Sequence, residues 1–302
     1  MLVVEFKQVL CPVDLSELSI RSLDYAGAIA KLYDGELTAL HVVPTFEPME
    51  VRAGALYDPV RIVYPMPREE VLERLRQALE AAGAPTAHVT LVTEAGEVAA
   101  TIVDQAVTRR SDLVVMGTHG RSGFNRLLLG SVTEKVLRTS PCPVLTVPPH
   151  APAAPPSDVA IRRILCPIDF SSAALQAFGF AMDLARRTNA SVAVLYVIEW
   201  LPEEEPRALA HFNVPEYRQY LTLNARERLE ALIAQESPRG ATEGTVVIGR
   251  AHREIVRVAD TGVDLIVMGA QGRGGHVLPA FGSTTQQVVR AASCPVLSVH
   301  GA

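Results

Sequence analysis

The chain has 302 residues, of which 48% are hydrophobic and 5% aromatic, and its formal net charge is −5. This length predicts two domains of about 150 residues each. The composition predicts aliphatic cores of the kind found where helices cover both faces of a parallel sheet. The negative charge excludes a global attraction to nucleic acid or to an anionic membrane.

The first segment, MLVVEFKQVLCPVD, is apolar but carries Glu5 and Lys7 and lacks a small-residue cleavage site. It therefore predicts neither a membrane span nor a signal peptide, and we expect a soluble, cytoplasmic protein. KQVLCPV reads as a buried strand. Ser16 is placed to cap a helix that runs to about Tyr33, with Gly35 just beyond its end.

Strands and helices then alternate along the first half of the chain. The predicted elements are, in order, a strand ELTALHVV, a periodic helix REEVLERLRQALEAAG, a strand AHVTLVT, a helix from about Glu97 to Thr108, a strand DLVVMG, a short helix and a strand PVLTV. Continuous apolar strands separated by amphipathic helices indicate a doubly wound parallel sheet.

The second half repeats this order. LCPVDLS recurs as LCPIDFS, DLVVMG as DLIVMG and CPVLTV as CPVLSV. Between the copies lies PPHAPAAPPSD, in which five residues are proline, a composition typical of a linker. We therefore predict one domain over 1–148, a linker over 149–158 and a second domain over 159–302.

Each half also carries a long Pro-rich insert after its second strand, at 44–68 and at 199–218. Inserts of this length can be lids or loose surface loops, and the sequence favours neither. The four cysteines fall outside C-x-x-C pairs and metal-ligand spacings, so we expect buried free thiols.

A glycine pattern occurs twice where a strand gives way to a helix. GTHGRSGFNRLLLGS, from Gly117 to Ser131, and GAQGRGGHVLPAFGS, from Gly269 to Ser283, both read Gly, two residues, Gly, nine residues, Gly-Ser. Glycine can adopt positive φ and lets backbone N–H groups approach a ligand closely. Ser131 with Glu134, and Ser283 with Gln286, have the spacing of a capping box.

A helix N-terminus with free N–H groups and hydroxyls, here those of Thr133, Thr284 and Thr285, suits a phosphate. The alternative is that the glycines have a purely structural role, because glycines occur in many strand-to-helix connections. The stretch lacks the Gly-Lys-Ser/Thr of a Walker A loop, and its glycines are spaced too widely for a dinucleotide fingerprint. Without that lysine and a water-activating base, nucleotide binding is favoured over fast phosphoryl transfer.

Asp14 and Asp169 end the first strand of each copy. If the first and fourth strands are neighbours, each aspartate faces its glycine stretch at the point where the sheet changes winding direction. The carboxylate would repel phosphates, so it suits the ribose or base end of a nucleotide. The alternative is that it only caps the turn that follows.

The motifs PVDLS, LHVV, DLVVMGTHGRSG, LLLGSVTEKVL and PCPVLTV, in that order, resemble a universal stress protein domain, and the second copy resembles another. The resemblance covers nearly the whole chain except the linker and much of the inserts. It implies an α/β fold of two tandem doubly wound domains, each with a five-stranded parallel sheet in the order 3-2-1-4-5. It also implies that the glycine stretch holds ATP. Mg²⁺ or Mn²⁺ bound to the phosphates of ATP is an option that the resemblance does not decide.

By this resemblance, two sets of residues bind the nucleotide. The positions expected to line adenine and ribose in the first copy are Pro12, Val13, Asp14, Val42, Met116 and Gly117. Those expected to hold the phosphates are Gly120, Arg121, Gly130, Ser131, Val132 and Thr133. The matching positions of the second copy are Pro167, Ile168, Asp169, Val197, Met268, Gly269, Gly272, Arg273, Gly282, Ser283, Thr284 and Thr285.

The second copy departs from the pattern within its glycine stretch. Gln271 replaces His119, GG replaces SG, and VLPAFG with Pro279 replaces RLLLG. The three glycines keep the same spacing, so nucleotide binding is still expected, although the middle of the loop would have a different shape. The replacement by Gln271 argues against a shared catalytic role for His119, which we expect to position the loop by hydrogen bonding.

The sequence is compatible with three functions. The first is an ATP-binding regulatory protein of the stress response, the second an enzyme acting at the nucleotide phosphates with at most slow hydrolysis, and the third a nucleotide-free scaffold for other proteins. The last strands, PVLTV and PVLSV, would lie at sheet edges that need covering. Members of the family that the chain resembles pair at these strands, so the resemblance implies that the two domains pair as a pseudo-dimer, and homodimers of the whole chain are a further option.

Overall fold

The computed structural model describes residues 5–45, 67–81, 88–119, 129–151, 161–199, 214–235, 242–272 and 281–301. The elements of the first repeat are β1 (Gln8–Pro12), α1 (Glu17–Leu32), β2 (Glu36–Pro44), α2 (Arg68–Ala81), β3 (Val89–Gly96), α3 (Val98–Thr108), β4 (Leu113–Gly117), α4 (Ser131–Thr139) and β5 (Val144–Val147). Those of the second are β6 (Arg163–Ile168), α5 (Ser172–Thr188), β7 (Ser191–Ile198), α6 (Val214–Gln235), β8 (Thr242–Ile248), α7 (Ala251–Ala259), β9 (Leu265–Gly269), α8 (Ser283–Ala291) and β10 (Val296–Val299).

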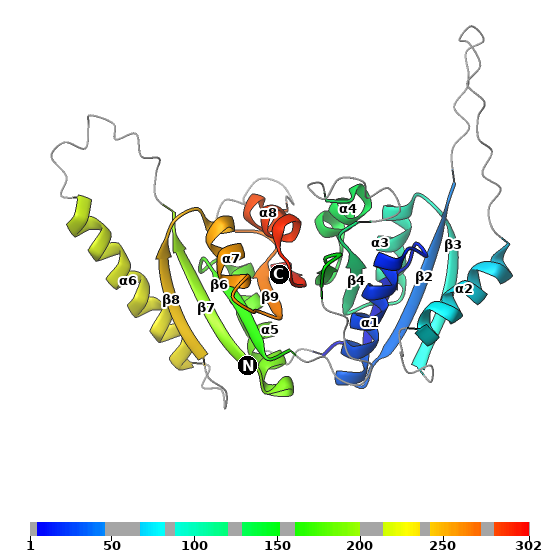
Figure 1. Cartoon of the computed structure of the whole chain (residues 1–302), viewed down its shortest axis with the longest axis horizontal. Coiled ribbons are helices and arrows are strands. Elements are labelled where there is room, and N and C mark those ends of the chain that lie inside the picture. Colours follow the sequence, from blue (N-terminus) through cyan, green and yellow to red (C-terminus); the bar gives the residue numbers. More distant parts are fainter. Residues whose placement is uncertain are drawn as a thin grey trace, which may run out of the picture.

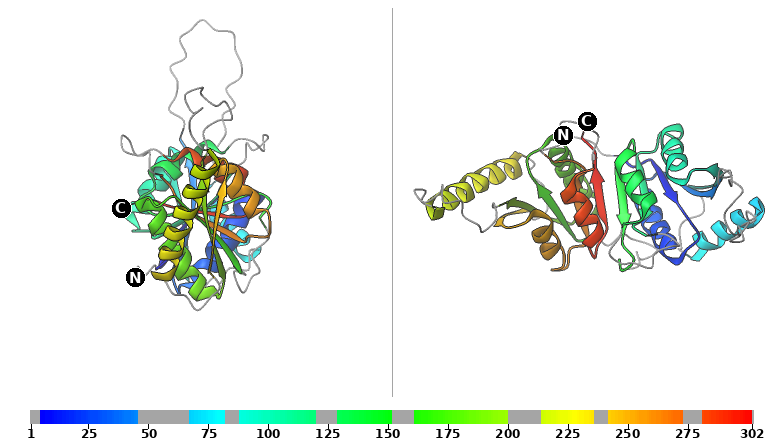
Figure 2. Two further views of the ribbon diagram at one scale, coloured as in Figure 1. Left: turned by 90° about the vertical axis from the view of Figure 1, so that its left-hand side faces the viewer. Right: turned by 90° about the horizontal axis from the view of Figure 1, so that it is seen from above.

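The ten strands of the described residues form one sheet in the order β3-β2-β1-β4-β5-β10-β9-β6-β7-β8. Each repeat therefore has the predicted order 3-2-1-4-5, and its neighbouring strands are parallel. The two repeats meet through β5 and β10, which pair antiparallel with Leu145 opposite Leu297. Figure 1 shows the repeats on either side of this junction, with α2 and α6 at opposite ends of the molecule, and Figure 2 shows β5 and β10 side by side from above.

Helices cover both faces of the sheet because its strands are apolar on both faces. In β1, Val9 and Cys11 pack in the cluster that contains residues of α1, α2, α5 and α6. Leu10, between them, points to the opposite face, where it joins residues of α3, α4, α7 and α8. This alternation follows the two-residue period of a strand.

The structure changes the predicted boundary of the second insert. α6 begins at Val214, inside the segment expected to be a Pro-rich insert, with Pro215 in its first turn. Proline is tolerated there because a first-turn N–H has no partner within the helix. The linker from residue 152 onward and most of both inserts lie outside the described residues.

Among the described residues, no helix combines the length and the hydropathy that crossing a membrane requires. The four cysteines are buried and unpaired, as expected. Burial raises the pKa of the Cys142 thiol to about 11 and that of Cys294 to about 12, which keeps both protonated near neutral pH.

Candidate functional site

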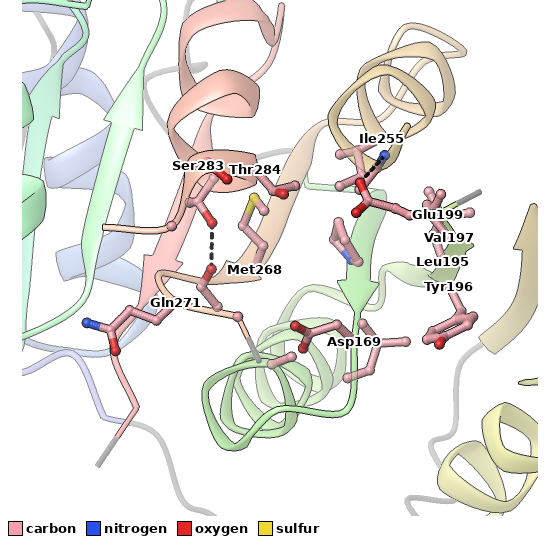
Figure 3. Close-up of a pocket in the computed structure, with 18 of the residues that line it drawn as sticks. Asp169, Leu195, Tyr196, Val197, Glu199, Ile255, Met268, Gln271, Ser283 and Thr284 are labelled. Carbon is pink, nitrogen blue, oxygen red and sulfur yellow. Dashed lines mark hydrogen bonds between the residues drawn. The ribbon is translucent and has the colours of Figure 1, made fainter. Parts of the chain in front are cut away.

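A cavity of about 690 Å³ opens at the carboxyl ends of β6, β7 and β9, beside the first turns of α7 and α8 (Figure 3). β6 pairs with β7 on one side and with β9 on the other, so the cavity lies where the winding of the second repeat changes direction. Open α/β sheets bind ligands at this topological position.

Most predicted residues of the second repeat line this one cavity. They are Pro167, Ile168, Asp169, Val197, Met268, Gly269, Gly272, Gly282, Ser283, Thr284 and Thr285. The remaining one, Arg273, lies outside the described residues. Nine further residues line the cavity and were not predicted from the sequence, namely Ala174, Leu195, Tyr196, Ile198, Glu199, Ala251, Ile255, Gln271 and Phe281.

One of the missed residues left a signal in the sequence. Glu199 is a charged residue directly after the buried strand VLYVI, at the end of the sheet where a ligand was expected. Its carboxylate Oε1 accepts a hydrogen bond of 3.0 Å from the backbone N–H of Ala251, in the first turn of α7. The start of α7 therefore helps to build the cavity wall.

Asp169 contributes to both the turn and the cavity. Its Oδ1 accepts hydrogen bonds from the N–H of Ser171 at 2.9 Å and from the Ser171 hydroxyl at 2.6 Å. Its Oδ2 lies so near Gly272 that a Cβ on that glycine would stand 2.9 Å away. The carboxylate thus does cap the turn, and it also faces the second glycine of the loop.

Asp14 is arranged in the same way in the first repeat. Its Oδ1 accepts from the N–H of Ser16 at 3.0 Å and from the Ser16 hydroxyl at 2.5 Å. The residue after each aspartate has a positive φ, 63° at Leu15 and 62° at Phe170. This left-handed residue turns the chain, so that the serine can bond the aspartate and cap the next helix.

The helices that follow the glycine stretches begin one residue earlier than predicted. Gly130 is the N-cap of α4 and Gly282 the N-cap of α8, with φ of −60° and −64°, and neither forms a side-chain cap. The predicted capping boxes on Ser131 and Ser283 are therefore wrong, because both serines occupy the first helical position. The glycine N-cap offers no side-chain acceptor that would compete with an anion for the first-turn N–H groups.

Two of the predicted phosphate-binding hydroxyls have another partner. The Thr133 hydroxyl donates to the carbonyl oxygen of Gly117 at 2.9 Å, and that of Thr285 donates to Gly269 at 2.8 Å. Both threonines are buried, so each ties the start of a helix to the end of the neighbouring strand. For these residues only the backbone N–H could serve a phosphate, whereas Ser283 and Thr284 keep their side chains at the cavity.

Close approach, rather than positive φ, accounts for the described glycines at the two ends of these loops. Among the described glycines only Gly262 has a positive φ. A Cβ on Gly269 would lie 2.9 Å from the backbone nitrogen of Ala174, and one on Gly282 would lie 3.1 Å from the carbonyl oxygen of Ala270. A side chain at either position would therefore displace the backbone that shapes the cavity.

The first repeat places its predicted residues at corresponding positions. Strands β1, β2 and β4 end at Pro12, Pro44 and Gly117. The backbone N–H of Val13 donates to Leu40 at 2.8 Å, which extends the strand pairing toward the expected cleft. The predicted residues found at these strand ends or at the start of α4 are Pro12, Val13, Asp14, Val42, Met116, Gly117, Gly130, Ser131, Val132 and Thr133. Gly120 and Arg121 lie outside the described residues.

His119 forms a hydrogen bond of 2.9 Å between its Nδ1 and the hydroxyl of the preceding Thr118. This contact is compatible with the predicted positioning role, although its partner is the adjacent residue. Within the described parts of the chain, no group of three or more His, Cys, Asp or Glu side chains could hold a metal ion.

Comparisons with known proteins all point to the same protein family. The model of the universal stress protein family matches residues 5–148 and again residues 160–300. A universal stress protein of Mycobacterium tuberculosis is 30% identical over 241 residues, which cover 76% of this chain and 73% of that protein. A universal stress protein of Mycolicibacterium smegmatis is 26% identical over 304 residues, covering 97% and 96% of the two chains.

The fold also recurs among solved structures. The crystal structure of a universal stress protein from Archaeoglobus fulgidus matches with a TM-score of 0.67 at 24% sequence identity. The match covers 98% of this chain and 97% of that one. At this level of identity, the likeness supports the tandem fold of the whole chain.

Proposed function

The chain belongs to the universal stress protein family, and from this premise and the geometry of its clefts we propose that it is an ATP-binding regulatory protein. Each repeat contributes one cleft, in which the triphosphate lies at the start of α4 or α8. Adenine and ribose lie toward the ends of β1 and β2, or of β6 and β7. Any Mg²⁺ or Mn²⁺ would arrive with the phosphates of the nucleotide.

The observation that carries this proposal is the start of α8. Gly282 begins the helix without a side-chain cap, and Ser283 and Thr284 stand at the wall of a 690 Å³ cavity. The positive end of the helix dipole and the first-turn N–H groups together favour an anion. A cavity of this volume is within the range of small-molecule sites.

A regulatory role fits the same geometry better than rapid catalysis does. The carboxylate nearest the loop, Asp169, accepts two hydrogen bonds from Ser171 through one oxygen, which holds it in a turn. A fixed carboxylate of this kind suits ribose hydroxyls more than activation of a water molecule. Nucleotide occupancy would then change the surface that a protein partner contacts.

We also propose that the two halves are domains, 1–148 and 159–302, that pair as a pseudo-dimer around the linker 149–158. The antiparallel pairing of β5 with β10 supports this arrangement, since it covers the edge that each five-stranded sheet would otherwise expose. Hydrogen bonds across the junction support it further, such as that from the Gln286 side chain to Glu134 at 3.2 Å.

Calorimetric titration of the full chain with ATP, in the presence of Mg²⁺, tests the proposal. The informative variants are Ser131→Asp and Ser283→Asp, which put a carboxylate at the exposed first position of α4 or α8. Negative charge there suits the helix end but repels a phosphate, so each variant should fold normally and lose one of two sites. We expect affinity at the altered site to fall roughly tenfold or more.

Ser131→Asn and Ser283→Asn are the matched controls, because asparagine has the shape of aspartate without its charge. They should retain both sites. If the wild-type chain does not bind ATP, or if both aspartate variants bind it as the wild type does, the triphosphate is not held by these helix ends, and a nucleotide-free scaffold becomes the better account.

A further inference from the structure

The second cleft has two chemically different ends. The start of α8 follows β9, whereas Glu199 and the start of α7 lie beside β7, and β6 runs between the two strands. If the triphosphate lies at α8, as proposed above, the base of the nucleotide extends toward β7 and α7. The inference below rests on that proposed function.

Glu199 faces this end of the cavity. Leu195 and Val197 pack with the cluster of residues from α7 and α8. Since side chains along a strand alternate, Glu199, two residues further on, points to the same face. It lines the cavity, and the Ala251 N–H holds its Oε1 at 3.0 Å, so the carboxylate has a defined place at the rim (Figure 3).

The first repeat has no such acceptor at the corresponding position. LHVVP aligns with LYVIE, so Pro44 stands where the second repeat has Glu199. Two carboxylates lie elsewhere at this end of the first repeat. Glu97 caps α3 by accepting from the Ala100 N–H at 2.7 Å and pairs with Lys135 at 3.0 Å, and Glu94 lies on the outer strand β3, opposite Val42. Within the described residues, a carboxylate at the end of the strand beside the first strand of the repeat is therefore found in the second repeat, as Glu199, and not in the first.

An ionised carboxylate can only accept hydrogen bonds. Guanine presents two adjacent donors, its ring N1–H and its 2-amino group, which match the two oxygens of one carboxylate. Adenine presents one amino group beside the ring acceptor N1, and that acceptor would face the negative charge. We propose that Glu199 gives the second cleft a higher guanine-to-adenine selectivity than the first cleft has.

The test measures both clefts separately in the full chain. The Ser131→Asp variant leaves the second cleft open and Ser283→Asp leaves the first, and each is titrated with the β,γ-imido analogues of GTP and ATP. We expect the ratio of GTP-analogue to ATP-analogue affinity to be higher in the Ser131→Asp variant. Adding Glu199→Gln to it should lower GTP-analogue affinity roughly tenfold and change ATP-analogue affinity less than about threefold.

Glutamine keeps the length of the side chain and an oxygen for the Ala251 N–H, so the start of α7 should be preserved, which the thermal unfolding midpoint checks. Titration of the wild type and of Glu199→Gln alone gives a second readout that requires no blocked cleft. If the analogues bind and Glu199→Gln leaves the affinity ratio unchanged in both backgrounds, the inference is overturned while nucleotide binding stands. If neither analogue binds the wild type, the proposed function itself fails.

Discussion

At the residue scale, an aspartate at the end of the first strand of each repeat is followed by a left-handed residue, Leu15 or Phe170. That conformation costs on the order of 1 kcal/mol for a residue other than glycine. Phe170 retains it while its ring packs against Tyr196, at 5.3 Å between centroids, and against the guanidinium of Arg228 at 4.1 Å. Packing thus holds a strained turn that aims the aspartate at the cleft.

Asp169→Asn separates the two roles of this carboxylate. The amide oxygen can still accept from Ser171, so the free energy of unfolding should change by less than about 0.5 kcal/mol. The negative charge facing Gly272 is lost, and we expect ATP affinity at the second cleft to fall roughly fivefold, because a charged acceptor is lost from the ribose hydroxyls. Denaturant unfolding and calorimetry of the Ser131→Asp background measure the two effects. A stability loss without any change in affinity would leave Asp169 as a turn cap alone.

Asp24, half-buried on α1, makes the stability of the protein depend on pH. Burial raises the pKa of Asp24 to about 6, although the guanidinium of Arg21 opposes this. The folded state therefore favours the protonated carboxyl. The contribution of Asp24 to the free energy of unfolding is fully present below about pH 4 and is lost as the pH rises through about 6. Asp24→Asn should thus stabilise the protein at pH 7 by about 1 kcal/mol, allowing for solvent near the group.

The advantage of Asp24→Asn should disappear below about pH 4, as chemical unfolding at several pH values would reveal. Asp104→Asn, on the exposed side of α3, is the control and should have little effect throughout. An Asp24→Asn variant that gains stability equally at pH 4 and pH 7 would contradict the assigned cause.

At the element scale, the starts of α4 and α8 are tied to the ends of β4 and β9 in two ways. Gly282 donates its N–H to the carbonyl oxygen of Ala270 at 2.8 Å, and the Thr285 hydroxyl donates to Gly269. The same pair of bonds joins Gly130 to Thr118 and Thr133 to Gly117. A helix end held in this way needs little rearrangement on binding, which would favour the proposed nucleotide site.

Thr285→Val tests this element. Valine keeps the shape of threonine but removes the donor and leaves a buried carbonyl oxygen of Gly269 without its partner, so we expect a loss of about 1–2 kcal/mol in unfolding free energy. ATP affinity at the second cleft should fall as well, because the helix end is less firmly placed. Thr285→Ser restores the donor and should recover both properties. Recovery of stability without recovery of affinity would separate the helix tie from binding.

The resemblance to the family implied the strand order, and the apolar runs that alternate with amphipathic stretches predicted most element positions. The starts of α4 and α8 were misplaced by one residue, since Ser131 with Glu134 has capping-box spacing although Gly130 is the actual N-cap. Glu199 was missed although its place directly after a buried strand was a signal, whereas its hydrogen bond to the start of α7 could not be predicted because that contact depends on how β7 and α7 pack. Nor could the sequence predict that Thr133 would turn its hydroxyl toward Gly117, a contact made only once β4 and α4 pack.

At the scale of the whole molecule, the two repeats are joined by more than the β5–β10 pairing. Tyr33, at the end of α1, donates its hydroxyl to the carboxylate of Asp183 in α5 at 3.1 Å. Arg187 bonds the same carboxylate oxygen at 3.0 Å and lies over the Tyr33 ring at 4.3 Å. Burial and the adjacent Asp183 carboxylate raise the pKa of Tyr33, so it stays a donor.

Tyr33→Phe removes this bond between the repeats while keeping the ring. We expect a loss of about 1.5–3 kcal/mol in unfolding free energy, the scale of a hydrogen bond to a charged group. Tyr220→Phe, at a tyrosine that is 62% exposed, is the control and should change little. Denaturant unfolding followed by circular dichroism measures both. Equal effects of the two substitutions would mean that the Tyr33–Asp183 contact does not stabilise the junction.

A crystal structure of the full chain with ATP would show whether the uncapped first turns of α4 and α8 hold the triphosphate of a nucleotide. We expect phosphate oxygens within hydrogen-bonding distance of the backbone N–H groups of residues 131–133 and 283–285, with Asp14 and Asp169 near the ribose. Phosphates bound elsewhere, with these amides facing protein or water, would contradict this expectation.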